Sequence, residues 1–395
     1  MLDAFCNMNA LVNKFVVTLS FQDLEDPPIH KDITELDLNI NRKLCDLLLT
    51  YKNMINLYNH NRAWDKNKKY TNEYEYIYSS PSCESNISLY TPVSRSFFKM
   101  WEILNDFKDV LFPIKDPMNF MFLCEGPGGF AEAVMKFRDN PKDTYFGMTL
   151  RCDNNRSIPS WKYNDSRLNI VYGADGTGNL YHLENIKYLT KITQGKNKVD
   201  VITADGGFDF SSDFNNQEDM CAKLIAAEIL TAMMLQKEGG HLILKVFDIF
   251  NENTLKLIHV LLDVYQTIHI TKPCTSRPAN SEKYLVCLHF KGCTEPHSAK
   301  MKHHIGGLED FMKSDSNILS LPHVSSFQSH VINKIVRYNT YAVMKQINYI
   351  QKTIDLIKDP HMKSNYIEKN PVLCHQWCKK YGVLHHSNVD KSKDN

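Results

Sequence analysis

The sequence predicts an α/β fold in which a mostly parallel sheet is covered by helices on both faces. From residue 119 to residue 290 of the 395-residue chain, apolar strand-like runs alternate with amphipathic helical segments. A glycine-rich turn follows the first run, which is typical of a strand that leads directly into a helix. The last two runs lie close together, so we expect the final strand to run antiparallel.

Seven strands and four helices are expected in this region. The strands fall near residues 120–124, 145–150, 168–172, 199–204, 240–246, 266–272 and 284–290. The helices fall near 129–138, 183–193, 218–237 and 253–263, and Gly239 and Gly240 should end the third. Because ligands of open α/β sheets bind beyond the carboxyl ends of the strands, the turns at 125–129, 175–178 and 205–207 should share one rim.

The flanking segments have different patterns. Before the core, residues 15–21 could form a short strand, and helices are expected at 33–58 and 95–107. Segment 60–78 interleaves basic and aromatic residues. Such a segment is either a solvated loop or a surface that stacks a base and holds phosphates, and composition favours the loop. After the core, helices are expected at 332–357 and 372–380.

These patterns predict four parts of the chain. We expect an N-terminal extension at 1–90 that could contact nucleic acid, a core at 91–292, a helical extension packed on the core at 293–384, and a polar tail at 385–395. Lysine and arginine (46) balance aspartate and glutamate (45), which excludes a globally basic protein but not a local basic groove. Eleven cysteines without paired spacing, no long apolar run and no signal-peptide pattern indicate a soluble intracellular protein without membrane contact.

The segment at 121–130, MFLCEGPGGF, combines a buried strand, a glycine-rich turn and a helix start. Its spacing matches neither G-x-G-x-x-G nor a Walker motif. Glycines let the backbone approach a ligand, and the helix start offers free N–H groups. The segment therefore suits a nucleoside ligand without a pyrophosphate, such as S-adenosylmethionine, or is an ordinary tight turn.

A lysine inside an apolar strand is the second notable feature. Lys245 is flanked by apolar residues and should be costly to bury unless a carboxylate pairs with it. Asp205, at the end of the neighbouring strand, is the natural partner. The pair could be structural only, but Lys99 and Glu282 near the same rim would indicate a functional cleft.

Five ordered motifs make the sequence recognisable: SRSFFK at 94–99, EGPGGF at 125–130, TADGGF at 203–208, LKVFD at 244–248 and SRPANSEKY at 276–284. Together they resemble the FtsJ-like (RrmJ-type) ribose 2′-O-methyltransferases. Segments 146–150, 175–179 and 377–382 are most similar to the cap-specific mRNA branch of that superfamily. The resemblance implies a Rossmann-like, S-adenosylmethionine-dependent methyltransferase sheet with helical N- and C-terminal extensions.

The resemblance also implies an activity: methyl transfer to the ribose 2′-hydroxyl of the first or second transcribed nucleotide of 5′-capped mRNA. The resemblance implies that the catalytic tetrad of this family corresponds to Lys99, Asp205, Lys245 and Glu282. The implied cofactor contacts are Ser94, Cys124, Glu125, Gly126, Pro127, Gly128, Gly129, Phe130, Asp175 and Gly176. The implied substrate contacts are Asn215, Asn216, Gln217, Asn280, Lys68 and Lys69.

One position departs from many methyltransferases. Thr149 stands where an acid commonly holds the cofactor ribose, a departure shared with the cap branch, and Asp153 is a possible substitute. No metal is expected. Cys374, Cys378, His385 and His386 could suggest zinc, but the two cysteines lie one helical turn apart beside Trp377 and are better interpreted as core residues.

Three alternatives remain open from the sequence. The chain could methylate ribosomal or transfer RNA, or it could be a non-catalytic RNA-binding capping subunit. It could also be a nicotinamide oxidoreductase, but its sequence lacks the G-x-G-x-x-G turn that is typical of that class. The expected partner is capped RNA, with transcription or capping machinery as further candidates, and the expected location is the nucleus, the cytoplasm or, for a viral protein, a viral factory.

Overall fold

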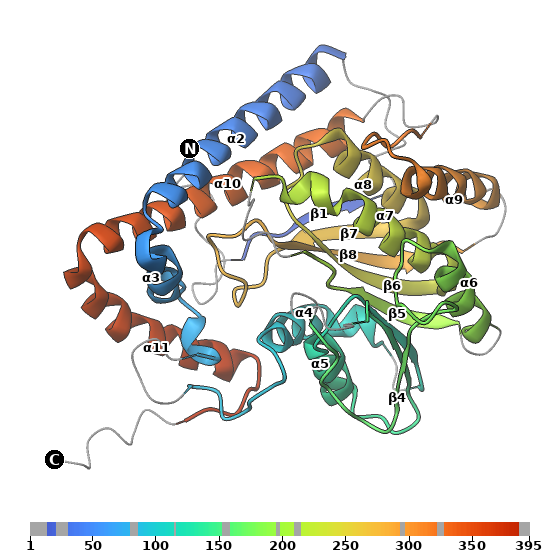
Figure 1. Cartoon of the computed structure of the whole chain (residues 1–395), viewed down its shortest axis with the longest axis horizontal. Coiled ribbons are helices and arrows are strands. Elements are labelled where there is room, and N and C mark those ends of the chain that lie inside the picture. The colour runs from blue at the N-terminus through green and yellow to red at the C-terminus, as the bar shows by residue number, and fades with distance from the viewer. Residues whose placement is uncertain are drawn as a thin grey trace.

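The structure, a computed structural model, places the strands in one mixed sheet of eight (Figure 1). It describes residues 14–20, 31–79, 86–113, 116–151, 159–194, 198–208, 215–292, 297–321 and 328–386. The strands are β1 (Val17–Ser20), β2 (Asn119–Leu123), β3 (Thr144–Met148), β4 (Leu168–Val171), β5 (Val199–Ala204), β6 (Gln236–Val246), β7 (Tyr265–Thr271) and β8 (Lys283–Phe290).

The strand order is β1-β7-β8-β6-β5-β2-β3-β4. Strands β2 to β6 pair in parallel, whereas β8 runs antiparallel to both β6 and β7. The predicted α/β fold with an antiparallel final strand is therefore confirmed. The predicted number of seven strands is wrong by one, because β1 adds an antiparallel strand beside β7 at the edge.

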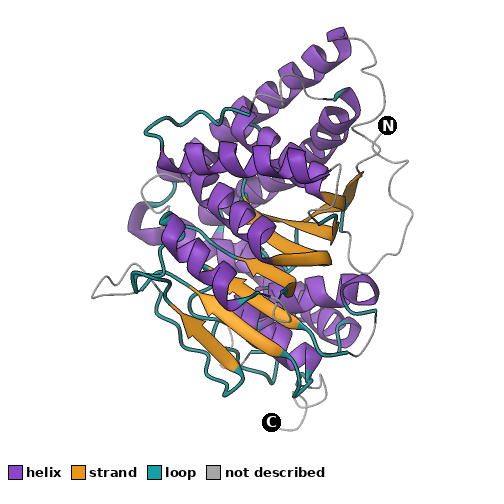
Figure 2. Ribbon diagram, turned by 90° about the vertical axis from the view of Figure 1, so that its right-hand side faces the viewer, coloured by secondary structure: helices purple, strands orange, loops and turns teal. Residues whose placement is uncertain are grey.

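The helices occupy both sides of this sheet (Figure 2). The α-helices are α2 (Lys31–Leu57), α3 (Ala63–Thr71), α4 (Ser96–Leu111), α5 (Gly129–Arg138), α6 (Leu183–Ile192), α7 (Gln217–Leu235), α8 (Glu252–Val264), α9 (His297–Lys313), α10 (Ser329–Lys358) and α11 (Lys363–Lys380). None of those the structure describes is long and apolar enough to cross a membrane.

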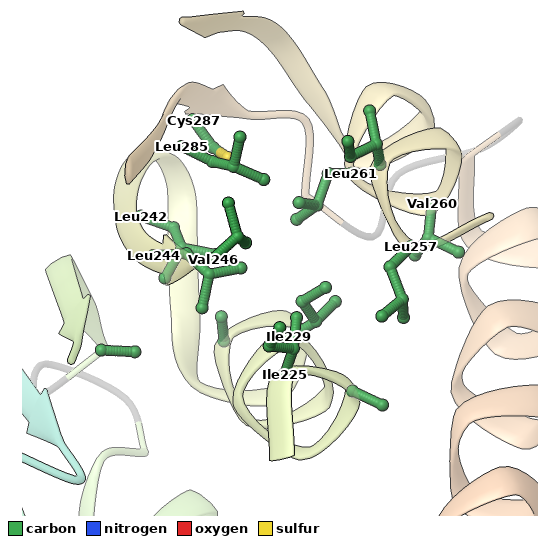
Figure 3. Packing of buried hydrophobic residues seen from close by; sticks show 14 of the residues in the cluster. Ile225, Ile229, Leu242, Leu244, Val246, Leu257, Val260, Leu261, Leu285 and Cys287 are labelled. Carbon is green, nitrogen blue, oxygen red and sulfur yellow. The ribbon is translucent and has the colours of Figure 1, made fainter. Parts of the chain in front are cut away.

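Successive side chains of the strands point to opposite faces of the sheet, and each face has its own hydrophobic core. Leu242, Leu244 and Val246 of β6 pack with α7 and α8 (Figure 3), whereas Ile243 belongs to the cluster on the other face, with α4 and α5. Because successive side chains of a strand point to opposite faces, Lys245 lies on the same face as Ile243. The strand thus aims one lysine toward α4.

A third cluster joins the N- and C-terminal helices. Leu48 of α2, Trp64 of α3 and Ile350 of α10 pack together. Figure 1 shows α2 and α10 side by side along one border of the molecule. Asn339 of α10 donates a hydrogen bond to Asn41 of α2 (2.7 Å) and another to the carbonyl oxygen of Ile249 (2.7 Å), which ties both helices to the segment after β6.

Three expectations about elements are wrong. Helix α7 ends at Leu235 and continues directly into β6, so Gly239 (φ 81°) lies within a strand instead of ending a helix. The loop expected at 60–78 contains helix α3. Helix α9 occupies a region where no element was expected.

Candidate active site

The four predicted catalytic side chains meet at the carboxyl ends of the parallel strands. Asp205 directly follows β5, Lys245 is the penultimate residue of β6, and Glu282 immediately precedes β8. Lys99 comes from α4, where Phe97, Phe98 and Met100 are buried around it. Only 7% of Lys99 is exposed, so it is not the solvated surface lysine that its helix alone would allow.

Two ion pairs connect the four residues. The Lys99 Nζ lies 2.7 Å from Glu282 Oε1, and the Lys245 Nζ lies 3.2 Å from Asp205 Oδ1. Lys245 also donates to the backbone carbonyl of Asp205 at 2.7 Å. The two ion pairs interact electrostatically, because the charge of Glu282 acts to raise the pKa of Lys245 and the charge of Asp205 acts to raise that of Lys99. The group is therefore one electrostatic unit.

Burial and charge move the pKa values of the two lysines in opposite directions. Burial lowers the pKa of Lys99, and the attraction of Glu282 offsets this only in part. Burial also acts to lower the pKa of Lys245, but Asp205 and Glu282 outweigh it and raise that pKa above its ordinary value. Glu282 is buried too, yet the lysines around it hold its pKa well below the usual range.

Glu282 is held by the loop at 273–282. Ser276 Oγ donates to Glu282 Oε1 at 2.7 Å. Lys272, just after β7, donates to the carbonyl oxygens of Asn280 (2.9 Å) and Glu282 (2.7 Å). Arg277 forms a two-point ion pair with buried Glu75 (3.0 and 2.6 Å). Each contact holds the segment that carries the Glu282 carboxylate in place.

A buried charge network centred on Asp248 also contacts the segment around Glu282. Asp248 lies 2.8 Å from Lys52 Nζ and 3.1 Å from Lys283 Nζ, and it accepts a hydrogen bond from Ser281 Oγ at 2.7 Å. Burial opposes ionisation of Asp248, but the two lysines keep its pKa well below the usual range. Sequence reasoning missed the roles of Lys52, Lys272 and Lys283. The motifs at 244–248 and 276–284 could have drawn attention to Asp248 and Lys283.

The predicted cofactor turn begins directly after β2, at Cys124. Cys124 adopts a positive φ (58°), and Gly128 (φ 106°) precedes α5. A Cβ on Gly128 would lie 2.9 Å from Tyr163 and 3.1 Å from Trp161, and one on Gly126 would lie 2.3 Å from the Pro159 carbonyl oxygen. These two glycines therefore leave room for a neighbouring segment of the chain itself. That they also let the backbone approach a ligand stays a prediction.

The other predicted cofactor residues surround this turn. A Cβ on Gly129 would meet Ser94 Oγ at 2.3 Å, so the predicted residue Ser94 touches the start of α5. Phe130 is buried within α5. Pro127 accepts hydrogen bonds from the backbone of Lys162 and Tyr163.

Asp175 and Gly176 lie on the loop after β4. That loop contacts the end of β3, because the Arg151 amide donates to the Thr177 carbonyl (2.8 Å). Asp175 itself accepts bonds from Thr177, Asn185 and His182. The His182 bond and those of Thr177 hold the pKa of Asp175 below its usual range. Its oxygens thus organise their own loop. Asp153, considered as a ribose contact, lies outside the described residues.

The predicted substrate residues divide into two groups. Lys68, Gln217 and Asn280 line one cavity of about 240 Å³, together with Trp64 and Arg277. Asn215 instead donates to Asn53 (2.7 Å), and Asn216 precedes α7. Lys69 is exposed on α3. None of the last three lines this cavity.

The cysteines considered for zinc lie in the core. Cys374 and Cys378 are fully buried on α11 with Trp377, as expected, and the Cys374 thiol donates to the Glu73 carbonyl. In the described ranges, no three histidine, cysteine, aspartate or glutamate residues are grouped to hold a metal ion.

Comparison with known proteins identifies the same region of the chain. The family model of FtsJ-like methyltransferases matches residues 92–290, half of the chain. A cap-specific mRNA (nucleoside-2′-O-)-methyltransferase 1 of Trypanosoma cruzi is 35% identical over 196 residues, which are 48% of this chain and 52% of that protein. The Danio rerio protein of that name is 33% identical over 207 residues (50% and 25%), and that of Dictyostelium discoideum is 29% identical over 322 residues (75% and 41%). This chain therefore spans about half or less of these relatives.

The turn fits the cofactor that such a family requires. Glu125 is buried at the start of the turn, where its Oε1 accepts a hydrogen bond from Thr203. Its Oε2 has no partner among the described residues, and burial raises the pKa of this carboxyl well above its usual value. A ligand that brings a cation or N–H donors to this oxygen would satisfy it, as the ammonium of S-adenosylmethionine can. The chain belongs to the FtsJ-like methyltransferase family, and S-adenosylmethionine is its cofactor.

Proposed function

We propose that this protein methylates the ribose 2′-hydroxyl of the first or second transcribed nucleotide of 5′-capped mRNA. The observation that carries the proposal is the convergence of Lys99, Asp205, Lys245 and Glu282 at the carboxyl rim of the sheet. The matching relatives support the substrate, because each of them is described as a cap-specific mRNA 2′-O-methyltransferase.

The tetrad can position and activate a hydroxyl group. S-adenosylmethionine, when bound, supplies an electrophilic methyl group on a sulfonium. Lys245, as its free amine, would accept the proton of the 2′-hydroxyl as the ribose oxygen takes up the methyl group that the cofactor would release from its sulfur. Lys99 orients the hydroxyl, and Asp205 and Glu282 set the charge of both lysines.

The raised pKa of Lys245 describes the protein without RNA and cofactor. A positive charge near an ammonium disfavours that ammonium, and S-adenosylmethionine would supply such a charge, which would favour the free amine of Lys245. Lys245 is thereby charged in the resting site and becomes a base when the site is filled.

The cavity at Trp64 is our candidate for the cap. Trp64 offers an aromatic wall, and the methylated guanine of a cap is a flat cation, which stacks favourably on indole. Asn280 and Gln217 offer amide groups to the edge of the base, and Lys68 offers a cation to the phosphates. Because Asn280 lies two residues before Glu282, the same loop contacts the cap and completes the tetrad.

The test is transfer of labelled methyl from S-adenosylmethionine to short RNAs. The RNAs carry a methylated-guanosine cap, an unmethylated cap or a 5′-triphosphate, and Lys245→Ala is the inactive control. We expect label on capped RNA only, at a ribose 2′-oxygen, and its loss in the variant.

Other outcomes decide between the alternatives. Equal labelling of all three RNAs would contradict the cap assignment and favour a ribosomal or transfer RNA substrate. Absence of labelling with retained cofactor binding would favour a non-catalytic capping subunit. Labelling at a base instead of a ribose would contradict the role proposed for the tetrad.

A further inference from the structure

A second, larger cavity lies between α10 and the segment 272–278. Its volume is about 820 Å³, within the range of small-molecule sites. It is lined by none of the four tetrad residues. It meets the smaller cavity at a shared wall formed by Asn72, Pro278 and Tyr349. It therefore adjoins the proposed cap cavity without being part of it.

The walls of this cavity carry a net positive charge. Arg337, Lys345 and Lys272 line it, and Glu73 is the carboxylate among its lining residues. Burial lowers the pKa of Lys272, so the positive charge lies on Arg337 and Lys345. Elsewhere in the protein most buried lysines face acids; Lys283, for example, lies 3.1 Å from Asp248. Within the part of the chain that the structure describes, Arg337 and Lys345 form no ion pair, so their charges are available to an anion.

The same walls carry aromatic surface. Phe15, Tyr74, Tyr341 and Tyr349 line the cavity. The rings of Phe15 and Tyr341 lie 4.7 Å apart, and Tyr341 lies beneath the Lys345 ammonium, 5.7 Å from its ring centroid. Rings beside cations can stack a flat base while the cations hold its phosphates. A purely apolar ligand would leave the cations unused.

Helix α10 arranges these groups by its periodicity. Arg337, Tyr341 and Lys345 follow one another at intervals of four residues, which places them on one face of the helix. Arg337 is exposed at one end of this row, and Lys345 lies beside the 272–278 segment. The row therefore runs from solvent into the cavity.

We propose that this cavity binds a phosphorylated nucleoside, with Arg337 and Lys345 on the phosphates and the aromatic walls on the base. The proposal goes beyond methyl transfer and does not depend on it. The nucleotide can be free or part of an RNA chain, since both present the same base and phosphate chemistry.

The test is photo-crosslinking of the full chain with 8-azidoadenosine triphosphate, followed by mapping of the labelled peptides. S-adenosylhomocysteine is added in excess to fill the cofactor site. We expect label on the α10 peptide that contains Tyr341, which lines this cavity and not the Trp64 cavity, and competition by inorganic tripolyphosphate. A parallel experiment uses a 5′-triphosphate RNA with 4-thiouridine; labelling of the same peptide would identify RNA as a source, and labelling by the free nucleotide alone would identify mononucleotides.

The key variant is the double substitution R337E/K345E, and its control is K108E/K142E. Both doubles change the net charge by the same amount, but Lys108 and Lys142 are exposed and line none of the cavities described above. We expect labelling to fall about tenfold or more in R337E/K345E and to persist in the control.

Two results would overturn the proposal. One is label confined to peptides outside this cavity, such as those of the Trp64 cavity. The other is equal labelling of wild type and R337E/K345E without competition by tripolyphosphate. Competition between tripolyphosphate and the label is measured on the wild-type protein, so this result tests the proposal even if a variant fails to fold. Because methyl transfer is not the readout, failure here is distinguishable from failure of the proposed function.

Discussion

Glu282 acts on both lysines of the predicted tetrad. It pairs with Lys99 at 2.7 Å and also raises the pKa of Lys245. Its carboxylate therefore stabilises the charged form of both lysines. Lys245 must lose that charge before it can act as the proposed base, so we expect Glu282 to influence the pH at which the site becomes active.

We expect Glu282→Gln to shift the rise of the methyl-transfer rate toward lower pH. The wild-type rate should increase with pH as Lys245 loses its proton, and removal of a nearby negative charge lowers the pKa of Lys245. The maximal rate should also fall about tenfold or more, since Lys99 loses its partner. Single-turnover rates from pH 6 to pH 10 provide the measurement.

Glu252→Gln is the control, because Glu252 is exposed and pairs with Lys256 away from the tetrad. Its pH profile should match that of the wild type. A rate that decreases with rising pH in both proteins would show that Lys245 acts as an ammonium instead of as a base.

Lys272 offers a second test at the level of single residues. It holds Asn280 and Glu282 through their carbonyl oxygens, so Lys272→Met should loosen the loop that contributes to both the cap cavity and the tetrad. We expect kcat/KM for capped RNA to fall about tenfold or more, with a rise in KM and unchanged affinity for S-adenosylmethionine.

Lys272→Arg should restore part of that activity, since it retains N–H donors for the carbonyl oxygens of Asn280 and Glu282. Equal losses in both variants, accompanied by weaker cofactor binding, would indicate a general loss of folding instead of a positioning role. Circular dichroism and thermal unfolding separate these cases.

At the scale of elements, regular patterns were predictable and irregular ones were not. Strand β5 and helix α5 have the predicted bounds, because an apolar run and a helical stripe are local features. Helix α3 was missed because its sequence is mostly polar, and α9 was missed because histidines and lysines are frequent in it. The end of α7 was misplaced because Gly239 and Gly240 lie where the pairing of β6 with β5 shifts register.

The site shows the same division. Lys99, Asp205, Lys245 and Glu282 belong to ordered motifs and were predicted as a set, whereas Lys52 and Lys272 have no sequence pattern that marks them. Their roles arise from long-range contacts: Lys52 reaches Asp248 across 196 residues. Such contacts become visible only when the chain is folded.

The contact between α2 and α10 gives a prediction about stability. Asn339 is buried and bonds to both Asn41 and the Ile249 carbonyl. Asn339→Leu leaves these acceptors without that donor, so we expect the free energy of unfolding to fall by about 1–3 kcal/mol. Urea unfolding measures the change.

Asn348→Leu is the matched control on the same helix. Asn348 is exposed, and the same substitution there should change the free energy of unfolding by less than about 0.5 kcal/mol. Equal effects at both positions would show that the buried hydrogen bonds contribute little to stability.

At the scale of the whole molecule, the flanking segments complete the sheet and its surroundings. Strand β1 pairs with β7 from Val17 to Ser20, and Trp377 of α11 packs against Phe98 of α4. The division into an extension at 1–90, a core at 91–292 and an extension at 293–384 remains a prediction.

A fragment of residues 91–292 tests that division. Removal of β1 exposes the edge of β7, and removal of α10 and α11 uncovers apolar side chains, so we expect this fragment to aggregate. A fragment of residues 14–386 should remain monodisperse and unfold cooperatively. Size-exclusion chromatography with thermal unfolding compares them, and a monodisperse, cooperatively unfolding 91–292 fragment would show that the core is independent.

The pairing of β1 with β7 also has a consequence for how the chain is made. Val17 lies opposite Ile270, so the first strand leaves the ribosome long before its neighbour exists. At about 5–20 residues per second, β1 waits on the order of 10–50 s for β7 to emerge. The edge of the sheet is therefore closed late in synthesis, and nascent chains should bind chaperones until residues near 270 have emerged.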